Sequence, residues 1–162
     1  MKPKMKKTDL SNHVDIWDAV INVLSEDFPE DDETYKEAFM VYNYYSEVES
    51  GGHESLFNWG WEDLQAQGIS KYITDLTANL EKIGANAYGQ IITAYGEEMW
   101  RLFLILEHEE MDEDAFTELE QEFYTVINKA NDEYFKLNNQ LEKLLESYFV
   151  RIHNDLFEVI EN

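Results

Sequence analysis

Apolar side chains recur every three or four positions along most of this chain, which is the spacing of one face of an α-helix. Over residues 14–24, Ile16, Val20 and Leu24 follow this repeat, and Ser11 or Asn12 is available as the N-cap. The same pattern predicts helices over residues 34–50, 69–83, 86–95 and 99–110, and over one or two stretches between residues 112 and 148. The helix at 99–110 is apolar on most sides in its first half, so we expect it to be the most buried.

Glycines mark the predicted helix ends. Gly51-Gly52, Gly84 and Gly96 each follow a periodic stretch, and glycine adopts the left-handed C-cap conformation without steric cost. We therefore expect the helices to stop at these positions.

Two stretches are less regular. The pattern over residues 53–61 indicates a short aromatic turn of helix or a loop, with a bend at Trp59-Gly60-Trp61 whose large rings pack against one end of the core. The repeat slips by one position between Ala130 and Tyr134, which favours a break over residues 128–132, although one long helix with a bend also fits.

The resulting fold class is all-α, a single-domain compact bundle of about seven to eight helices over residues 13–162. A length of 162 residues suits one hydrophobic core, and seven glycines and two prolines are too few to punctuate a many-stranded β-sandwich. Residues 1–12 are expected to form a mobile basic tail, because four lysines occur in the first seven positions and no apolar run follows them.

Composition also limits the compartment and the chemistry. The chain has no cysteine, which excludes disulfides, thiol catalysis and cysteine-ligated metals and is typical of a cytoplasmic protein. We expect no secretion signal, because no apolar run follows the first lysines, and the sequence contains no run of about 18 apolar residues that could span a membrane.

The net charge of -23, from 35 acidic and 12 basic residues, disfavours direct binding to nucleic acid or to an anionic membrane. The acids concentrate in two runs. The longer acidic run comprises Glu107, Glu109, Glu110, Asp112, Glu113, Asp114, Glu118, Glu120 and Glu122. The shorter acidic run comprises Glu26, Asp27, Glu30, Asp31, Asp32 and Glu33.

Stability does not explain these runs. Acids near helix termini gain only tenths of a kcal/mol from the helix dipole, and like charges at this density repel one another. A compact domain of this length is roughly 40 Å across, and duplex DNA carries about 24 charges over that distance. The protein's total charge is therefore comparable with that of DNA, but imitation of DNA requires the acids to gather on one side. The alternative is a solvated surface that only serves solubility.

The motifs of common enzymes are absent. Residues 51–55, Gly-Gly-His-Glu-Ser, lack the lysine of a phosphate-binding loop and the Gly-x-Ser-x-Gly pattern of a serine hydrolase. We therefore expect no enzyme activity, no catalytic residue and no cofactor.

Metal-site patterns are absent as well. The four histidines, His13, His53, His108 and His153, form neither His-Glu-x-x-His nor repeated Glu-x-x-His. The segment beginning at Asp112 resembles a calcium loop for three residues only. His108 and Asp112 lie four positions apart, so an adventitious divalent ion there is the remaining alternative. We expect no dedicated metal site.

Residues 43–58 read Asn-Tyr-Tyr-Ser-Glu-Val-Glu-Ser-Gly-Gly-His-Glu-Ser-Leu-Phe-Asn, and residues 132–137 read Asp-Glu-Tyr-Phe-Lys-Leu ahead of a leucine repeat. These two stretches resemble the signature and final helix of a bacterial family named after a DNA-mimic protein. The resemblance covers most of the chain from about residue 14. It implies an all-helical, non-enzymatic acidic protein that occupies the nucleic-acid-binding surface of a basic regulator, with a homodimer as a further expectation.

Within this signature we interpret five residues as structural: Glu47, Gly51, Gly52, Phe57 and Asn58. Glycine would form the turn, Phe57 would enter the core, and the two polar side chains would bond the backbone of the loop. A ligand site there is the alternative.

Three functions therefore compete. The first is a DNA mimic that binds a basic DNA-binding protein. The second is an immunity or inhibitor protein that neutralises a toxin, and the third is an enzyme that uses residues 53–61 as a pocket.

Overall fold

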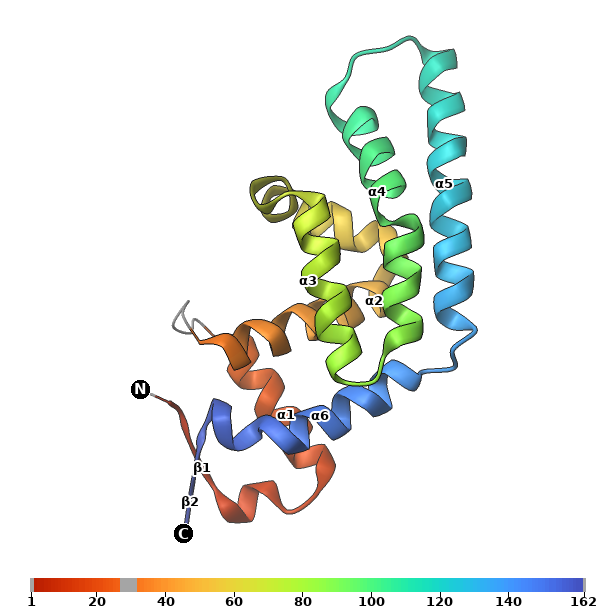
Figure 1. The fold of residues 1–162 in the computed structure, drawn as a ribbon. Helices are drawn as coiled ribbons and strands as arrows, with labels where there is room; N and C mark the ends of the chain where they lie inside the picture. The colour runs from red at the N-terminus through yellow and green to blue at the C-terminus, as the bar shows by residue number, and fades with distance from the viewer. Residues whose placement is uncertain (1, 27–31, 162) are drawn as a thin grey trace.

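The computed structural model describes residues 2–26 and 32–161, and it confirms an all-helical fold (Figure 1). The helices are α1 (His13–Leu24), α2 (Glu33–Gln67), α3 (Ile69–Lys82), α4 (Asn86–His108), α5 (Glu113–Phe135) and α6 (Gln140–Leu156). A short 3-10 helix, η1 (Lys7–Leu10), precedes α1. Two short strands, β1 (Lys4–Lys6) and β2 (Glu158–Ile160), pair in parallel and hold the chain ends together.

The described residues contain six α-helices, so the prediction of seven to eight was wrong. One cause is Gly96, which was expected to end a helix but lies inside α4. A Cβ atom at Gly96 would come within 2.8 Å of Ile73 Cδ1 on α3. Gly96 therefore allows two helices to pack closely, and its small size rather than its backbone freedom explains its position.

The break between the last two helices lies later than predicted, because α5 continues through residues 128–132 and ends at Phe135. Phe123, Ile127, Ala130 and Tyr134 are all buried, and their spacings of four, three and four keep them on one helical face. The apparent slip in the repeat is thus the alternation of three- and four-residue spacings that a single continuous helix shows. The chain turns only after Phe135, where Asn138 and Asn139 adopt positive φ.

The glycine pair produces a kink within α2 instead of a terminus. Gly51 (φ −151°, ψ 20°) and Gly52 (φ 73°, ψ −172°) leave helical geometry, and the helix resumes at once in a new direction. Residues 53–61 are consequently helical, which was one of the two alternatives for this segment, but they lack the bend expected at Trp59-Gly60-Trp61.

The rings of this segment have different environments. Phe57 is fully buried, whereas Trp59 is 82% exposed, contrary to the expectation that it packs against the core. Phe57 and Trp61 are four positions apart and share the inner face, while residue 59 lies on the opposite side of the helix. Trp61 therefore packs against the core, whereas Trp59 faces solvent.

The helices pack around one continuous core. Helix α4 lies between α3 and α5 and contributes Tyr88, Ile92, Met99 and Leu102, each at most 1% exposed. Its side chains become half-buried from Leu104 and exposed from Glu107 onward. At the other end of the molecule α1 packs against α6, close to both chain termini (Figure 1).

Residues 2–12, which belong to the expected tail, include β1 and η1 and contact the C-terminal segment through β2. The mobility of this tail stays a prediction. Within the described ranges, none of the helices combines the length and apolar character needed to cross a lipid bilayer.

Candidate functional site

The longer acidic run forms the free end of the α4–α5 hairpin, which we call the acidic tip. All nine of its carboxylate residues are exposed, and they belong to the last turn of α4, the connecting segment and the first half of α5. In Figure 1 this end of the hairpin extends beyond the neighbouring helices. The fold therefore presents the nine acids as one local concentration of negative charge.

Local structure explains how the tip is built. Asp112 is the N-cap of α5, where its Oδ1 accepts a hydrogen bond of 2.8 Å from the backbone N–H of Ala115. Asp114, Glu118 and Glu122 follow at intervals of four, which aligns them along one side of α5. Because Phe123 and Ile127 hold the opposite side in the core, the carboxylates face outward.

A single basic residue lies at the base of the tip. Arg101 pairs with Glu98 and lies 3.8 Å from Glu122, and no lysine or arginine follows before Lys129. The Glu98 carboxylate raises the pKa of the Arg101 guanidinium, chiefly by accepting its hydrogen bonds. Apart from Glu122, the acids of the tip therefore have no lysine or arginine close by among the described residues.

The shorter acidic run lies elsewhere. Glu26 follows α1, Asp32 is the N-cap of α2, and Glu33 pairs with Lys36 at 3.8 Å. The remaining members, Asp27, Glu30 and Asp31, lie outside the described residues. Figure 1 shows the start of α2 far from the end of the α4–α5 hairpin, so the described members of the shorter run lie apart from the acidic tip.

The interpretation of His108 and Asp112 as neighbours on one helical face was wrong. Helix α4 ends at His108, and Asp112 caps the next helix. The His108 ring instead packs against Trp61, with 5.1 Å between ring centroids. Among residues 2–26 and 32–161, no three His, Asp or Glu side chains are placed to hold a metal ion together.

The five signature residues lie on both sides of the α2 kink and at the kink itself. Phe57 packs against Trp100 and Phe103 of α4, with ring centroids 6.0 and 5.9 Å away. Glu47 accepts a hydrogen bond of 2.7 Å from the Ser55 hydroxyl across the kink, so it bonds a side chain and not the backbone. Asn58 is exposed, and its side chain makes no hydrogen bond within the described part of the chain.

A buried histidine connects the kink to α5. The Oδ1 atom of Asn131 accepts from the His53 backbone N–H at 2.9 Å and lies 2.8 Å from His53 Nδ1. A backbone N–H can only donate, which identifies the Asn131 atom as the carbonyl oxygen and places the imidazole proton on Nδ1. His53 Nε2 then accepts from the Tyr44 hydroxyl at 2.7 Å. Every polar atom of this fully buried imidazole is therefore satisfied in its neutral form.

The sequence patterns indicated His53 as one of four candidate metal ligands and as part of a candidate pocket, and they did not indicate Tyr44 or Asn131. Had residues 53–67 been recognised as a helix, their spacing would have put His53 on the same inner face as Leu56, Phe57 and Leu64. The contact with Asn131 spans 78 positions, and no local pattern indicates it.

Burial of His53 makes the free energy of unfolding of this protein depend on pH. Desolvation lowers the pKa of His53 from 6.5 to about 4, opposed by its hydrogen bond to Asn131. Between these two values the unfolded chain binds a proton that the folded chain does not, so stability falls as the pH falls through this window. From the two pKa values we expect about 2 kcal/mol of stability to be lost from this group between pH 7 and pH 5.

Urea unfolding of the wild type and of His53→Gln at pH 7.0 and 5.0 measures this effect, because both proteins share every other titrating group. The free-energy advantage of the wild type should shrink by about 2 kcal/mol on going to pH 5. An advantage that stays constant with pH would show that His53 does not keep a lowered pKa in the folded protein.

Comparison with known proteins adds one finding. A family model described as DMP19-like protein matches residues 26–153, which include the kink, the acidic tip and most of the helical core. No curated protein and no solved structure matches the chain. The extent of the family match shows that the chain belongs to the DMP19-like family.

Proposed function

We propose that this protein is a DNA mimic that acts by binding, without catalysis, and that its acidic tip occupies the nucleic-acid-binding surface of a basic regulator. The observation that carries the proposal is the gathering of nine exposed carboxylates at the end of one hairpin. Membership of the DMP19-like family supports the same function.

The charge density of the tip supports imitation of a phosphate backbone. The first ten residues of α5 span about 14 Å of helix, and duplex DNA carries about eight charges over that length. The tip offers five carboxylates over these ten residues, and Glu107 and the connecting segment add four more at the same end of the hairpin. A lysine-rich and arginine-rich groove shaped for DNA would therefore meet a similar number of negative charges over a similar distance.

Rigidity supports the proposal further. The second half of α2 packs against α4 through Phe57 and Trp61, and α5 packs along α4 on its other side. Charges held on packed helices need little ordering when a partner binds, which lowers the entropic cost of association.

The proposal predicts that the tip, and not negative charge in general, determines binding. A tip variant would carry Gln in place of Glu109, Glu110, Glu118 and Glu120. These four side chains make no ion pair or hydrogen bond within the described residues, so their loss should not destabilise the fold. If each charge contributes about 0.5 kcal/mol, the affinity for the partner should fall by roughly 30-fold.

A control variant removes the same charge elsewhere, through Asp18→Asn, Glu81→Gln, Glu142→Gln and Asp155→Asn, all exposed on α1, α3 and α6. Wild type, tip variant and control variant would serve as baits in lysate, with bound proteins identified by mass spectrometry. We expect wild type and control to retain a DNA-binding protein that is released by duplex DNA and by high salt. Equal capture by the tip variant, or a partner insensitive to both DNA and salt, would contradict the proposal.

A further inference from the structure

A cavity of about 680 Å³ lies between the two halves of α2 and the outer side of α3, away from the acidic tip. The kink at Gly51-Gly52 creates it, because the two halves of α2 diverge and α3 crosses between them. Pockets for small ligands typically measure about 300–1,000 Å³, so this one has the appropriate size.

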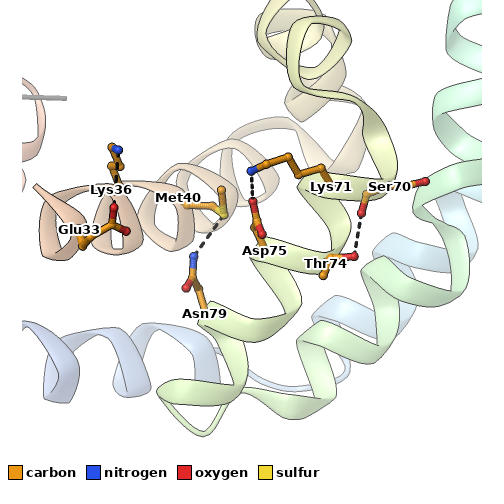
Figure 2. Close-up of polar contacts among 8 residues, drawn as sticks. All are labelled: Glu33, Lys36, Met40, Ser70, Lys71, Thr74, Asp75 and Asn79. Atoms are coloured by element: carbon orange, nitrogen blue, oxygen red, sulfur yellow. Dashed lines mark hydrogen bonds and ion pairs between the residues drawn. The ribbon is translucent and has the colours of Figure 1, made fainter. Parts of the chain in front are cut away.

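The floor of the cavity is apolar and well ordered by packing. Leu56, Leu64 and Tyr72 line it and are 2, 3 and 5% exposed. Met40 of α2 and Asn79 of α3 meet across the cavity, where the Asn79 amide donates to Met40 Sδ at 3.3 Å (Figure 2). An apolar ligand body can therefore rest on a formed surface.

The rim has a charge balance unlike that of the rest of the molecule. Three lysines, Lys36, Lys71 and Lys82, line the cavity, although the whole chain has only 12 basic residues. Four carboxylates accompany them, so the lining is nearly neutral within a chain of net charge -23.

Two of the rim groups, Lys36 and Asp63, are held less closely by partners than the others. Lys71 is paired with Asp75 at 2.6 Å and Lys82 with Glu37, but Lys36 lies 3.8 Å from Glu33 in an exposed pair (Figure 2). The fourth carboxylate, Asp63, makes no ion pair within the described residues. Asp63 is on the second half of α2 and Lys36 on the first half, so the two groups flank the cavity from different arms of the kink.

The charges of the rim and of the whole protein indicate which class of ligand fits the cavity. A purely anionic molecule is repelled by the negative field of the whole protein, and a purely cationic one is attracted to carboxylates over the entire surface. A zwitterion feels little net long-range force and can use both an ammonium and a carboxylate on the rim. An apolar body with one positive and one negative end matches the floor and the rim together.

We propose that this cavity binds a small zwitterion with an apolar body, of the size of a hydrophobic dipeptide, with Asp63 holding its ammonium group and Lys36 its carboxylate. This site is separate from the acidic tip and does not depend on the proposed function. The probe is the dipeptide Phe-Leu, whose two termini can be blocked one at a time.

The test compares Phe-Leu with its N-acetylated, C-amidated and doubly blocked forms, which share the two side chains and lack one or both terminal charges. Titration into ¹⁵N-labelled protein, followed by amide chemical shifts, should give saturable changes in α2 and α3. We expect Phe-Leu to bind at least fivefold more tightly than each of the three blocked forms. Asp63→Asn should remove the preference for a free ammonium, and Lys36→Gln the preference for a free carboxylate, while Glu62→Gln, exposed and outside the cavity, should change neither.

A second variant fills the cavity. Ala78 lines it from an exposed position on α3, so Ala78→Trp should abolish Phe-Leu binding while the protein remains folded, as its thermal unfolding would show. Ala94→Trp, on the exposed side of α4, is the matched control and should bind as the wild type does. The proposal is overturned if the doubly blocked peptide binds as tightly as Phe-Leu, if no saturable shifts occur at millimolar peptide, or if Ala78→Trp binds normally.

Discussion

Replacement of Phe57 by alanine should lower the free energy of unfolding by about 4 kcal/mol, the largest effect expected from a single substitution discussed for this protein. Phe57 is fully buried and packs against Trp100 and Phe103, so its removal leaves a cavity that rigid helices cannot close. Urea unfolding at neutral pH, followed by circular dichroism, measures the change.

Trp59→Ala is the matched control for this experiment. It removes an even larger ring only two positions away on the same helix, but that ring is 82% exposed. We expect a change within about 0.5 kcal/mol. Similar losses for Phe57→Ala and Trp59→Ala would mean that residues 53–67 are not oriented as the structure shows.

The second large effect is expected for Asn131→Ala, which should cost about 3 kcal/mol. The substitution removes the acceptor of two hydrogen bonds and leaves the backbone N–H and Nδ1–H of His53 buried without a partner. It also releases the connection between the α2 kink and α5.

Asn128→Ala, one turn earlier on α5 and exposed, should change stability by less than about 0.5 kcal/mol. Asn131→Asp keeps the accepting oxygen and should raise the pKa of His53, because it places a negative charge beside the imidazole. An Asn131→Ala protein as stable as the wild type would show that the buried imidazole is satisfied in another way.

These two sites explain how core residues contribute to the proposed function. The kink turns the second half of α2 toward α4, and Phe57 and Trp61 hold it there against Phe103 and His108. His53 and Asn131 fix the same segment to α5. Both helices of the acidic hairpin are thereby braced by one stretch of α2.

Features of this protein that have a local cause were predictable from the sequence, whereas features that depend on distant residues were not. The helical class was predictable because amphipathic spacing reflects the geometry of the helix itself, which each segment carries in its own residues. An N-cap at Ser11 or Asn12 was predictable for the same reason, since an N-cap bonds backbone groups two or three positions away, and Asn12 takes this position. The count of helices was not, because Gly96 and Gly51-Gly52 have the same local signal and different tertiary surroundings.

The sequence by itself determined that this protein is helical, strongly acidic and free of common catalytic motifs. The tertiary structure decided that Gly96 is a packing contact, that Trp59 faces solvent while Phe57 is buried, and that His53 meets Asn131. It also decided that the described members of the shorter acidic run lie apart from the acidic tip and that three scattered lysines line one cavity. The physical reason is that helical periodicity depends on neighbours within about one turn, whereas packing partners, burial and the summed field of charges depend on residues that only the folded chain brings together.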